Sequence, residues 1–209
     1  MQRAPAVPPR ARPSYSNGGY VVAAAMLERV AGSAYEALLR ERLFAPLGAE
    51  VAFGSPGAPG EPRGHARDRS GAWQPADPAA PGAELPAYAN PAGGAKLRGD
   101  DLASYLQLHL RALTGETGLV LTPASARELH AIVRDGYAMG WMAGEGLDGH
   151  ALSWHNGSDD ASYYALAAVG PSQGRGAAVV LTGLDTGSEQ QASSALARLM
   201  RQAPLLQKR

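Results

Sequence analysis

Cysteine is absent from the 209-residue sequence, and lysine occurs only at Lys96 and Lys208. Without a thiol the chain can form no disulfide, no thiolate nucleophile and no cysteine-ligated zinc site. The shortage of lysine equally restricts any chemistry that depends on an amine. A chain without cysteine is compatible with every redox compartment, so this absence does not indicate one.

Neither sign of charge is in excess, because 19 Lys and Arg residues balance 19 Asp and Glu residues. The charges are interspersed, so no long-range field favours nucleic acid or an anionic membrane as a partner. No signal-like apolar run follows the basic N-terminal segment, and no run is long enough to span a bilayer. As written, the chain is expected to be cytoplasmic; export of a longer parent protein stays open, so the localisation is unknown.

The hydrophobic content of 45% suffices for one buried core. Residues 1–14 are rich in Pro and Arg, and they predict a disordered segment before a single domain of residues 15–209. Residues 54–94 contain half of the prolines of the chain, which predicts a long excursion without regular elements.

Hydrophobic periodicity predicts an α+β fold. Helices are expected at 20–31, where Tyr20 is the first apolar position, and at 33–46, 100–113, 122–132 and 187–202. Capping boxes are expected at Ser33/Glu36 and Ser188/Gln191, and Asp100 or Asp101 and Thr122 are expected to cap the helices that they begin. The last helix has one apolar stripe, formed by Ala192, Ala195, Leu196, Leu199 and Met200. Between residues 137 and 183, short apolar runs predict an antiparallel sheet whose last two strands are central. The expected architecture is a helical subdomain followed by this sheet, which the C-terminal helix covers.

Two polar motifs stand out from this framework. Tyr15, Ser16 and Asn17 precede an apolar helix, where Ser and Asn alone would indicate no more than a helix cap. His155 lies inside a predicted strand and is followed by Gly157 and Ser158. Glycine in a strand often marks a place where a ligand approaches the backbone.

The order of motifs along the chain resembles a known superfamily. A Tyr-x-Asn helix mouth, a Pro-Ala-Gly-Gly turn before an Asp-Leu helix, Tyr-Ala-Met-Gly-Trp and a His-x-Gly strand follow one another. In this order the chain is similar, over residues 14–201, to serine β-lactamases and penicillin-binding proteins, specifically the class C β-lactamase-like branch. The resemblance implies an incomplete β-lactamase/transpeptidase-like fold and acyl transfer on an ester, a β-lactam or a D-amino-acid peptide.

The resemblance also implies a role for each motif residue. Tyr15 would relay protons, Asn17 would bind the substrate amide, and His155 would be the polar residue of the strand motif. Tyr15 and Asn17 are therefore expected to lie near His155 in one cleft. Gly157 would let the acyl group lie against the strand, and the amide of Ser158 would donate to the oxyanion. The implied substrate is a small molecule or a peptide, and no cofactor or metal is implied.

One departure from the family pattern affects activity. The family nucleophile lies in a Ser-x-x-Lys motif, whereas the residues three before Lys96 and Lys208 are Gly93 and Leu205. We therefore predict that the chain alone is inactive, either as a truncated piece of a bacterial hydrolase or as a degenerate relative. The alternative is a non-catalytic relative that binds a ligand without turnover.

Other candidate sites are weaker. Residues 170–174 match Gly-x-Ser-x-Gly, but they lie between two predicted strands, so Ser172 is predicted in a hairpin rather than at a nucleophile elbow. His155, Asp159 and Asp160 would form an incomplete metal shell. The remaining histidines are expected on surfaces or helix faces. The strand at 176–181 contains neither proline nor charge, and if unpaired it predicts self-association through its edge.

Overall fold

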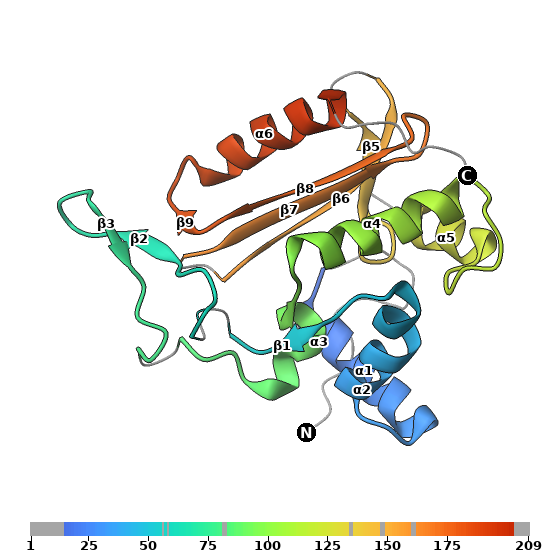
Figure 1. The fold of residues 1–209 in the computed structure, drawn as a ribbon, viewed down its shortest axis with the longest axis horizontal. Coiled ribbons are helices and arrows are strands. Elements are labelled where there is room, and N and C mark those ends of the chain that lie inside the picture. Colours follow the sequence, from blue (N-terminus) through green and yellow to red (C-terminus); the bar gives the residue numbers. More distant parts are fainter. Residues whose placement is uncertain are drawn as a thin grey trace.

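The computed structural model describes residues 15–55, 57, 59–80, 83–133, 136–146, 149–159 and 162–202 (Figure 1). The predicted disorder of residues 1–14 falls outside these ranges. The helices are α1 (Asn17–Ala31), α2 (Tyr35–Leu39), α3 (Asn90–Gly93), α4 (Gly99–Leu113), α5 (Pro123–His130) and α6 (Ser188–Gln202), with a π-helical turn at Arg40–Phe44 and 3₁₀ turns at Ala45–Leu47 and Ala87–Ala89. Within the described ranges no helix is both long and apolar enough to cross a membrane.

An antiparallel sheet in the order β5-β6-β7-β8 forms the centre of the fold. The strands are β1 (Ala52–Phe53), β2 (His65–Arg67), β3 (Trp73–Pro75), β4 (Ala95–Lys96), β5 (Met142–Glu145), β6 (Ala151–Ser158), β7 (Tyr164–Gly170), β8 (Arg175–Leu181) and β9 (Gly183–Leu184). Figure 1 shows α6 on one face of the sheet and α4 on the other. This arrangement confirms the α+β class and the C-terminal helix over the sheet.

Each face of the sheet has its own buried core, because side chains alternate along a strand. On the α6 face the cluster contains Tyr164, Leu166, Ala168, Ala192, Leu196 and Met200. On the α4 face it contains Leu106, Ala138, Trp141 and Val169. The periodicity of α6 placed Ala192, Leu196 and Met200 correctly, whereas Leu199 of the same predicted stripe is 43% exposed.

The prediction that the last two strands are central is right for β7 and wrong for β8. Strand β8 pairs with β7 alone among the described strands and lies at the edge of the sheet. Its apolar composition has another cause: α6 packs on one side of it and α4 on the other. A strand covered on both faces is apolar whether or not its edge is paired.

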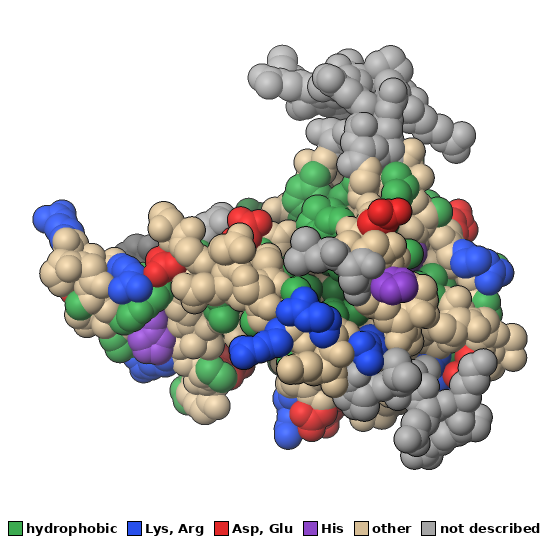
Figure 2. Space-filling view, turned by 90° about the horizontal axis from the view of Figure 1, so that it is seen from above, with side chains coloured by type: hydrophobic (Ala, Val, Ile, Leu, Met, Phe, Trp, Pro, Cys, Tyr) green, Lys and Arg blue, Asp and Glu red, His purple; other side chains and the backbone are tan. Residues whose placement is uncertain are grey.

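Residues 54–94 contain regular elements that their composition did not predict. Strands β2 and β3 form an antiparallel hairpin, and β2 also pairs with β9 in parallel. An ion pair of 2.9 Å between Arg67 Nε and Asp185 Oδ2 connects this hairpin to the residue that follows β9. Figure 2 shows the hairpin of β2 and β3 projecting from the body of the molecule, with basic side chains at its end.

Of the four caps predicted for the helices after residue 32, three differ in the structure. At α2 the N-cap is Ala34, and Glu36 accepts a hydrogen bond from Asn90 instead of closing a capping box. The Ser188 hydroxyl accepts from the Asp185 amide, before α6. Neither Asp100 nor Asp101 is the N-cap of α4, which is Arg98. Only Thr122 accepts the predicted capping bond, from the Ser125 amide.

Candidate active site

The mouth of α1 presents polar groups to solvent. Ser16 is the N-cap of α1 in an extended conformation, as its position predicts, but its side chain makes no capping hydrogen bond. Asn17 belongs to the first turn of the helix, where its Oδ1 accepts a hydrogen bond of 2.9 Å from the Tyr15 hydroxyl. Tyr15 is 57% exposed. This bond orients the phenol and leaves the amide NH₂ of Asn17 available to a ligand.

Strand β6 brings His155 to the same place. The ring centroids of Tyr15 and His155 lie 5.9 Å apart, although the two residues are far apart in the sequence. His155 faces the α4 side of the sheet, because it pairs with Ala167, which packs in the cluster under α4. The structure therefore brings together the two motifs that the sequence singled out.

Two further tyrosines complete this group, and neither is among the site residues that the sequence predicts. The Tyr137 hydroxyl lies 3.4 Å from His155 Nε2 and 2.9 Å from the Tyr20 hydroxyl. The Tyr15 ring contacts the rings of both, with centroid distances of 5.8 Å to Tyr137 and 6.4 Å to Tyr20. Tyr137 is the first residue of the Tyr-Ala-Met-Gly-Trp run, and this motif marks its segment as part of the family pattern. Tyr20 was counted only as an apolar position of the helix.

The four rings form a unit that we call the Tyr-His cluster, defined by Tyr15, Tyr20, Tyr137 and His155. Burial raises the pKa of Tyr137 well above its ordinary value. Tyr137 is therefore a neutral phenol over the physiological pH range, able to donate its proton in a hydrogen bond. Within the described residues, no Lys or Arg pairs with any of the four rings.

Beside His155 the sheet is uncovered on its α4 face. Gly157, Ala165 and Val180 form one row across β6, β7 and β8, and all three are exposed. A Cβ atom at Gly157 would meet nothing within 4 Å. Strand β5 pairs with residues 151–154 of β6 only, so residues 155–158 have a described partner on one side alone. The site thus contains an open patch of sheet and an open length of strand edge.

The excursion at 54–94 borders the far end of this strand. Ser158, the last residue of β6, is exposed. In the turn that follows, the Tyr163 hydroxyl donates to the Pro62 carbonyl at 2.6 Å. A Cβ atom at Gly64 would lie 2.4 Å from Ser162 Oγ, so this contact requires glycine. These contacts hold the excursion against the end of β6 where Gly157 and Ser158 lie.

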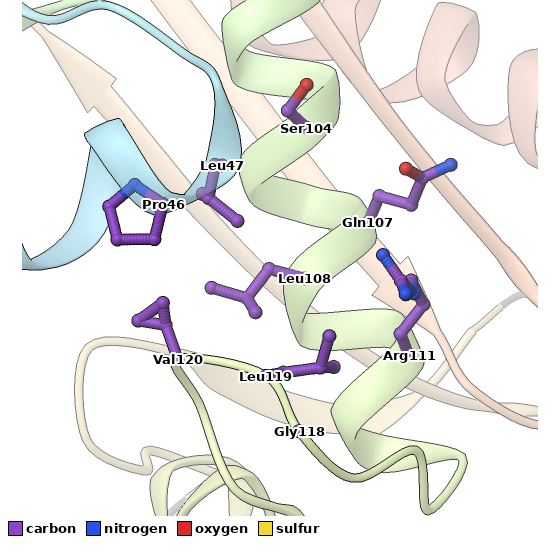
Figure 3. Close-up of a pocket in the computed structure, with 9 residues that line it drawn as sticks. All are labelled: Pro46, Leu47, Ser104, Gln107, Leu108, Arg111, Gly118, Leu119 and Val120. Carbon is purple, nitrogen blue, oxygen red and sulfur yellow. The ribbon is translucent and has the colours of Figure 1, made fainter.

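Other candidate sites do not gain support. Ser172 lies in the turn between β7 and β8, where Gln173 N donates to Gly170 O, which confirms the predicted hairpin. The group of His155, Asp159 and Asp160 was considered as a metal site, but Asp160 lies outside the described residues. A cavity of about 230 Å³ lies between α4 and residues 118–120. Figure 3 shows Arg111 among the residues that line it, and this guanidinium is already paired with Glu116.

The remaining histidines are expected on surfaces or helix faces, and His109 lies on the buried face of α4. Its side chain is 3% exposed, and its Nδ1 lies 2.9 Å from His130 Nε2. Trp141 stacks on His130 with ring centroids 4.7 Å apart. Burial lowers the pKa of His109 to about 3 and that of His130 to about 4, and their mutual repulsion contributes at His109. This pair is part of the core and makes no contact with the Tyr-His cluster.

Comparison with known proteins gives a consistent family and fold. Residues 1–201 match the Beta-lactamase family. The fold is similar to an octameric penicillin-binding protein homologue from Pyrococcus abyssi, with a TM-score of 0.71, 22% identity, and coverage of 92% of this chain and 44% of that one. It is also similar to SurE, with a TM-score of 0.70, 24% identity, and coverage of 92% and 45%. A comparison with curated protein sequences finds no match.

A class C beta lactamase from Rhodobacter sphaeroides has a TM-score of 0.61 and 18% identity, with coverage of 90% of this chain and 60% of that one. The chain therefore spans about half the length of the solved structures that it matches. The family match confirms the superfamily that the motif order indicated. The solved structures confirm the fold.

Proposed function

Because this chain belongs to the beta-lactamase family, we propose that it forms the tyrosine and histidine side of an acyl-transfer site. The carrying observation is the 5.9 Å contact between Tyr15 and His155, beside an uncovered patch of sheet. The patch has only small side chains at Gly157 and Ala165, so another segment can pack closely there. Such a segment would bring the serine and lysine that these 209 residues do not contain in a Ser-x-x-Lys motif.

The proposed chemistry gives the residues of this chain separate tasks. The serine oxygen of the added segment would attack a carbonyl carbon, and its proton would pass through the Tyr15 hydroxyl to the leaving nitrogen or oxygen as the bond to that atom breaks. Asn17 would donate its amide hydrogens to the substrate carbonyl. The backbone of Gly157 and Ser158 would bind the acyl group and its oxyanion. Water would then release the acid and restore the serine.

The substrate is proposed as an ester, a β-lactam or a peptide ending in a D-amino acid. Because the excursion at 54–94 lies against the end of β6, it would contact the part of the substrate that extends beyond Ser158. The second candidate function is ligand binding without turnover. It is favoured by the hydrogen bond between Tyr15 and Asn17, which orients the site in the absence of a nucleophile.

We expect the isolated chain to hydrolyse neither a chromogenic cephalosporin nor p-nitrophenyl butyrate above the buffer rate. A fluorescent penicillin should give no covalent adduct in intact-protein mass spectrometry. When a Ser-x-x-Lys segment of a penicillin-binding protein is fused to the chain or co-expressed with it, the adduct should form. In that assembly Tyr15→Phe should slow acylation by about 10²- to 10⁴-fold, the usual contribution of a positioned proton-transfer group.

Tyr88→Phe is the matched control, because this ring is 74% exposed and makes no contact with the Tyr-His cluster. Turnover by the isolated chain that survives the combined Tyr15→Phe and His155→Ala changes would contradict the proposal. If Ser172→Ala abolished such turnover, the hairpin serine would be the nucleophile. Reversible binding of benzylpenicillin without an adduct, in the assembly as well as in the chain, would favour the second candidate.

A further inference from the structure

We propose that Tyr137 is a positioning residue for His155, which it holds in the Nδ1–H tautomer as the middle member of a hydrogen-bond chain from Tyr20. The consequence for catalysis rests on the proposed acyl-transfer function. The tautomer itself does not, and it can be measured without a substrate.

The first step is the position of the proton on His155. Its Nδ1 lies 2.7 Å from the backbone carbonyl oxygen of Asn156. A carbonyl oxygen can only accept, so Nδ1 must carry a hydrogen. In a neutral imidazole the other nitrogen then has a lone pair and accepts. Nε2 of His155 is therefore an acceptor whenever the ring is uncharged.

The second step is the direction of the remaining bonds. Because Nε2 accepts, the Tyr137 hydroxyl at 3.4 Å must donate to it. The Tyr137 oxygen is then left to accept from the Tyr20 hydroxyl at 2.9 Å. The opposite direction would need hydrogens on both nitrogens of His155, and thus a charged ring. The chain of donors runs from Tyr20 through Tyr137 to His155.

The third step is what this chain connects. Tyr20 lies in α1, Tyr137 precedes β5, and His155 lies in β6. Two side-chain hydrogen bonds therefore connect the N-terminal part of α1 to the sheet. A Cβ atom at Gly140 would lie 3.6 Å from the Tyr20 hydroxyl, so the segment after Tyr137 also packs against this chain. The Tyr15 ring packs on all three members. The bonds thereby set the spacing between the Tyr15 phenol and the imidazole.

This arrangement restricts what a substrate can offer to His155. The bond from Tyr137 is long, so Nε2 can share its lone pair with a second donor. A substrate group that approaches Nε2 of the neutral ring must therefore bring an N–H or O–H. A carboxylate in this position would face a lone pair. The inference thus favours a substrate that donates a hydrogen bond next to its reacting carbonyl.

The test is ¹⁵N NMR of the full chain labelled at histidine nitrogens, with the signals of residue 155 identified by their loss in His155→Gln. On the pH plateau where the ring is neutral, the shifts should show hydrogen on Nδ1 and a lone pair on Nε2. Tyr137→Phe removes one of the two bonds that select this tautomer. A net hydrogen bond of about 0.5–1.5 kcal/mol corresponds to a roughly 2- to 10-fold shift of the tautomer ratio towards Nε2–H.

Tyr20→Phe should produce the same shift at a smaller size, because Tyr137 can still donate. Tyr88→Phe, the control of equal chemistry, should produce none. A wild-type ring with hydrogen on Nε2 would overturn the proposal, as would a ratio in folded Tyr137→Phe equal to that of the control. Failure of the acyl-adduct experiment would leave these shifts unchanged, so the two inferences can fail separately.

Discussion

Between pH 7 and pH 4.5 the free energy of unfolding should fall by about 3 to 5 kcal/mol through His109 and His130 alone. Each unit of pKa difference between the unfolded and folded states corresponds to about 1.36 kcal/mol. Burial lowers the folded-state pKa of these residues from 6.5 to about 3 and about 4. Since a small domain has about 5–15 kcal/mol in total, this loss is a large share of its stability.

The sign follows from which state binds protons. Above pH 6.5 both histidines are neutral in the folded and unfolded chain, so the full stability is present. As the pH falls below 6.5, both histidines become protonated in the unfolded chain but stay neutral in the folded chain. The free energy of unfolding therefore decreases until the pH reaches the folded-state pKa values. Further acidification below about pH 3 adds nothing through this pair.

Urea denaturation followed by circular dichroism at a series of pH values measures this slope. In the double variant His109→Gln, His130→Gln the slope between pH 6.5 and 4.5 should largely disappear, even if the variant is less stable at pH 7. His150→Gln changes an exposed histidine and is the control. A slope that persists in the double variant would place the acid sensitivity in other groups.

Self-association through β8 is the second large effect that we expect. Its outer edge has no partner among the described strands, and Val180 on this strand is 57% exposed. Edge strands of natural proteins are commonly protected by lysine, by proline or by a bulge. Residues 176–181 contain neither lysine nor proline. We propose that two copies pair along this edge, and that Val180→Lys raises the dissociation constant at least tenfold.

Sedimentation velocity over a range of concentrations measures the association. Val30→Lys is the control, since it makes the same substitution at an exposed valine of α1, away from the sheet, and adds the same charge. In the wild type, amide exchange along residues 177–181 should slow as the concentration rises. A wild-type protein that stays monomeric at high concentration, or equal effects of both substitutions, would contradict pairing at this edge.

The sequence predicted what local rules control. The strands of the antiparallel sheet, the Thr122 cap and the hairpin at 170–174 each follow from period or turn chemistry within a few residues. The contact between Tyr15 and His155 came from the order of motifs in a family, because no local rule relates such distant positions.

The remainder depended on tertiary contacts. The predicted capping box at Ser33 is wrong because Glu36 accepts a hydrogen bond from Asn90, which is distant in the sequence. Tyr137 and His109 were missed for a similar reason. Their partners, His155 and His130, lie on other elements. The Tyr-Ala-Met-Gly-Trp run marks the segment of Tyr137, but no local pattern shows which distant residue a tyrosine or histidine contacts. The edge position of β8 could not be inferred from composition, since its two faces are covered by helices.

Strand β6 is an interior strand for half of its length and an edge strand for the other half. Residues 151–154 have neighbours on both sides, so their backbone groups are committed to the fold. From His155 onwards one row of backbone donors and acceptors has no described strand opposite it. A ligand with an amide of its own could extend the sheet by one short strand there, recognised through main-chain geometry. Side-chain substitutions in this half would then change which ligand is preferred more than whether one binds.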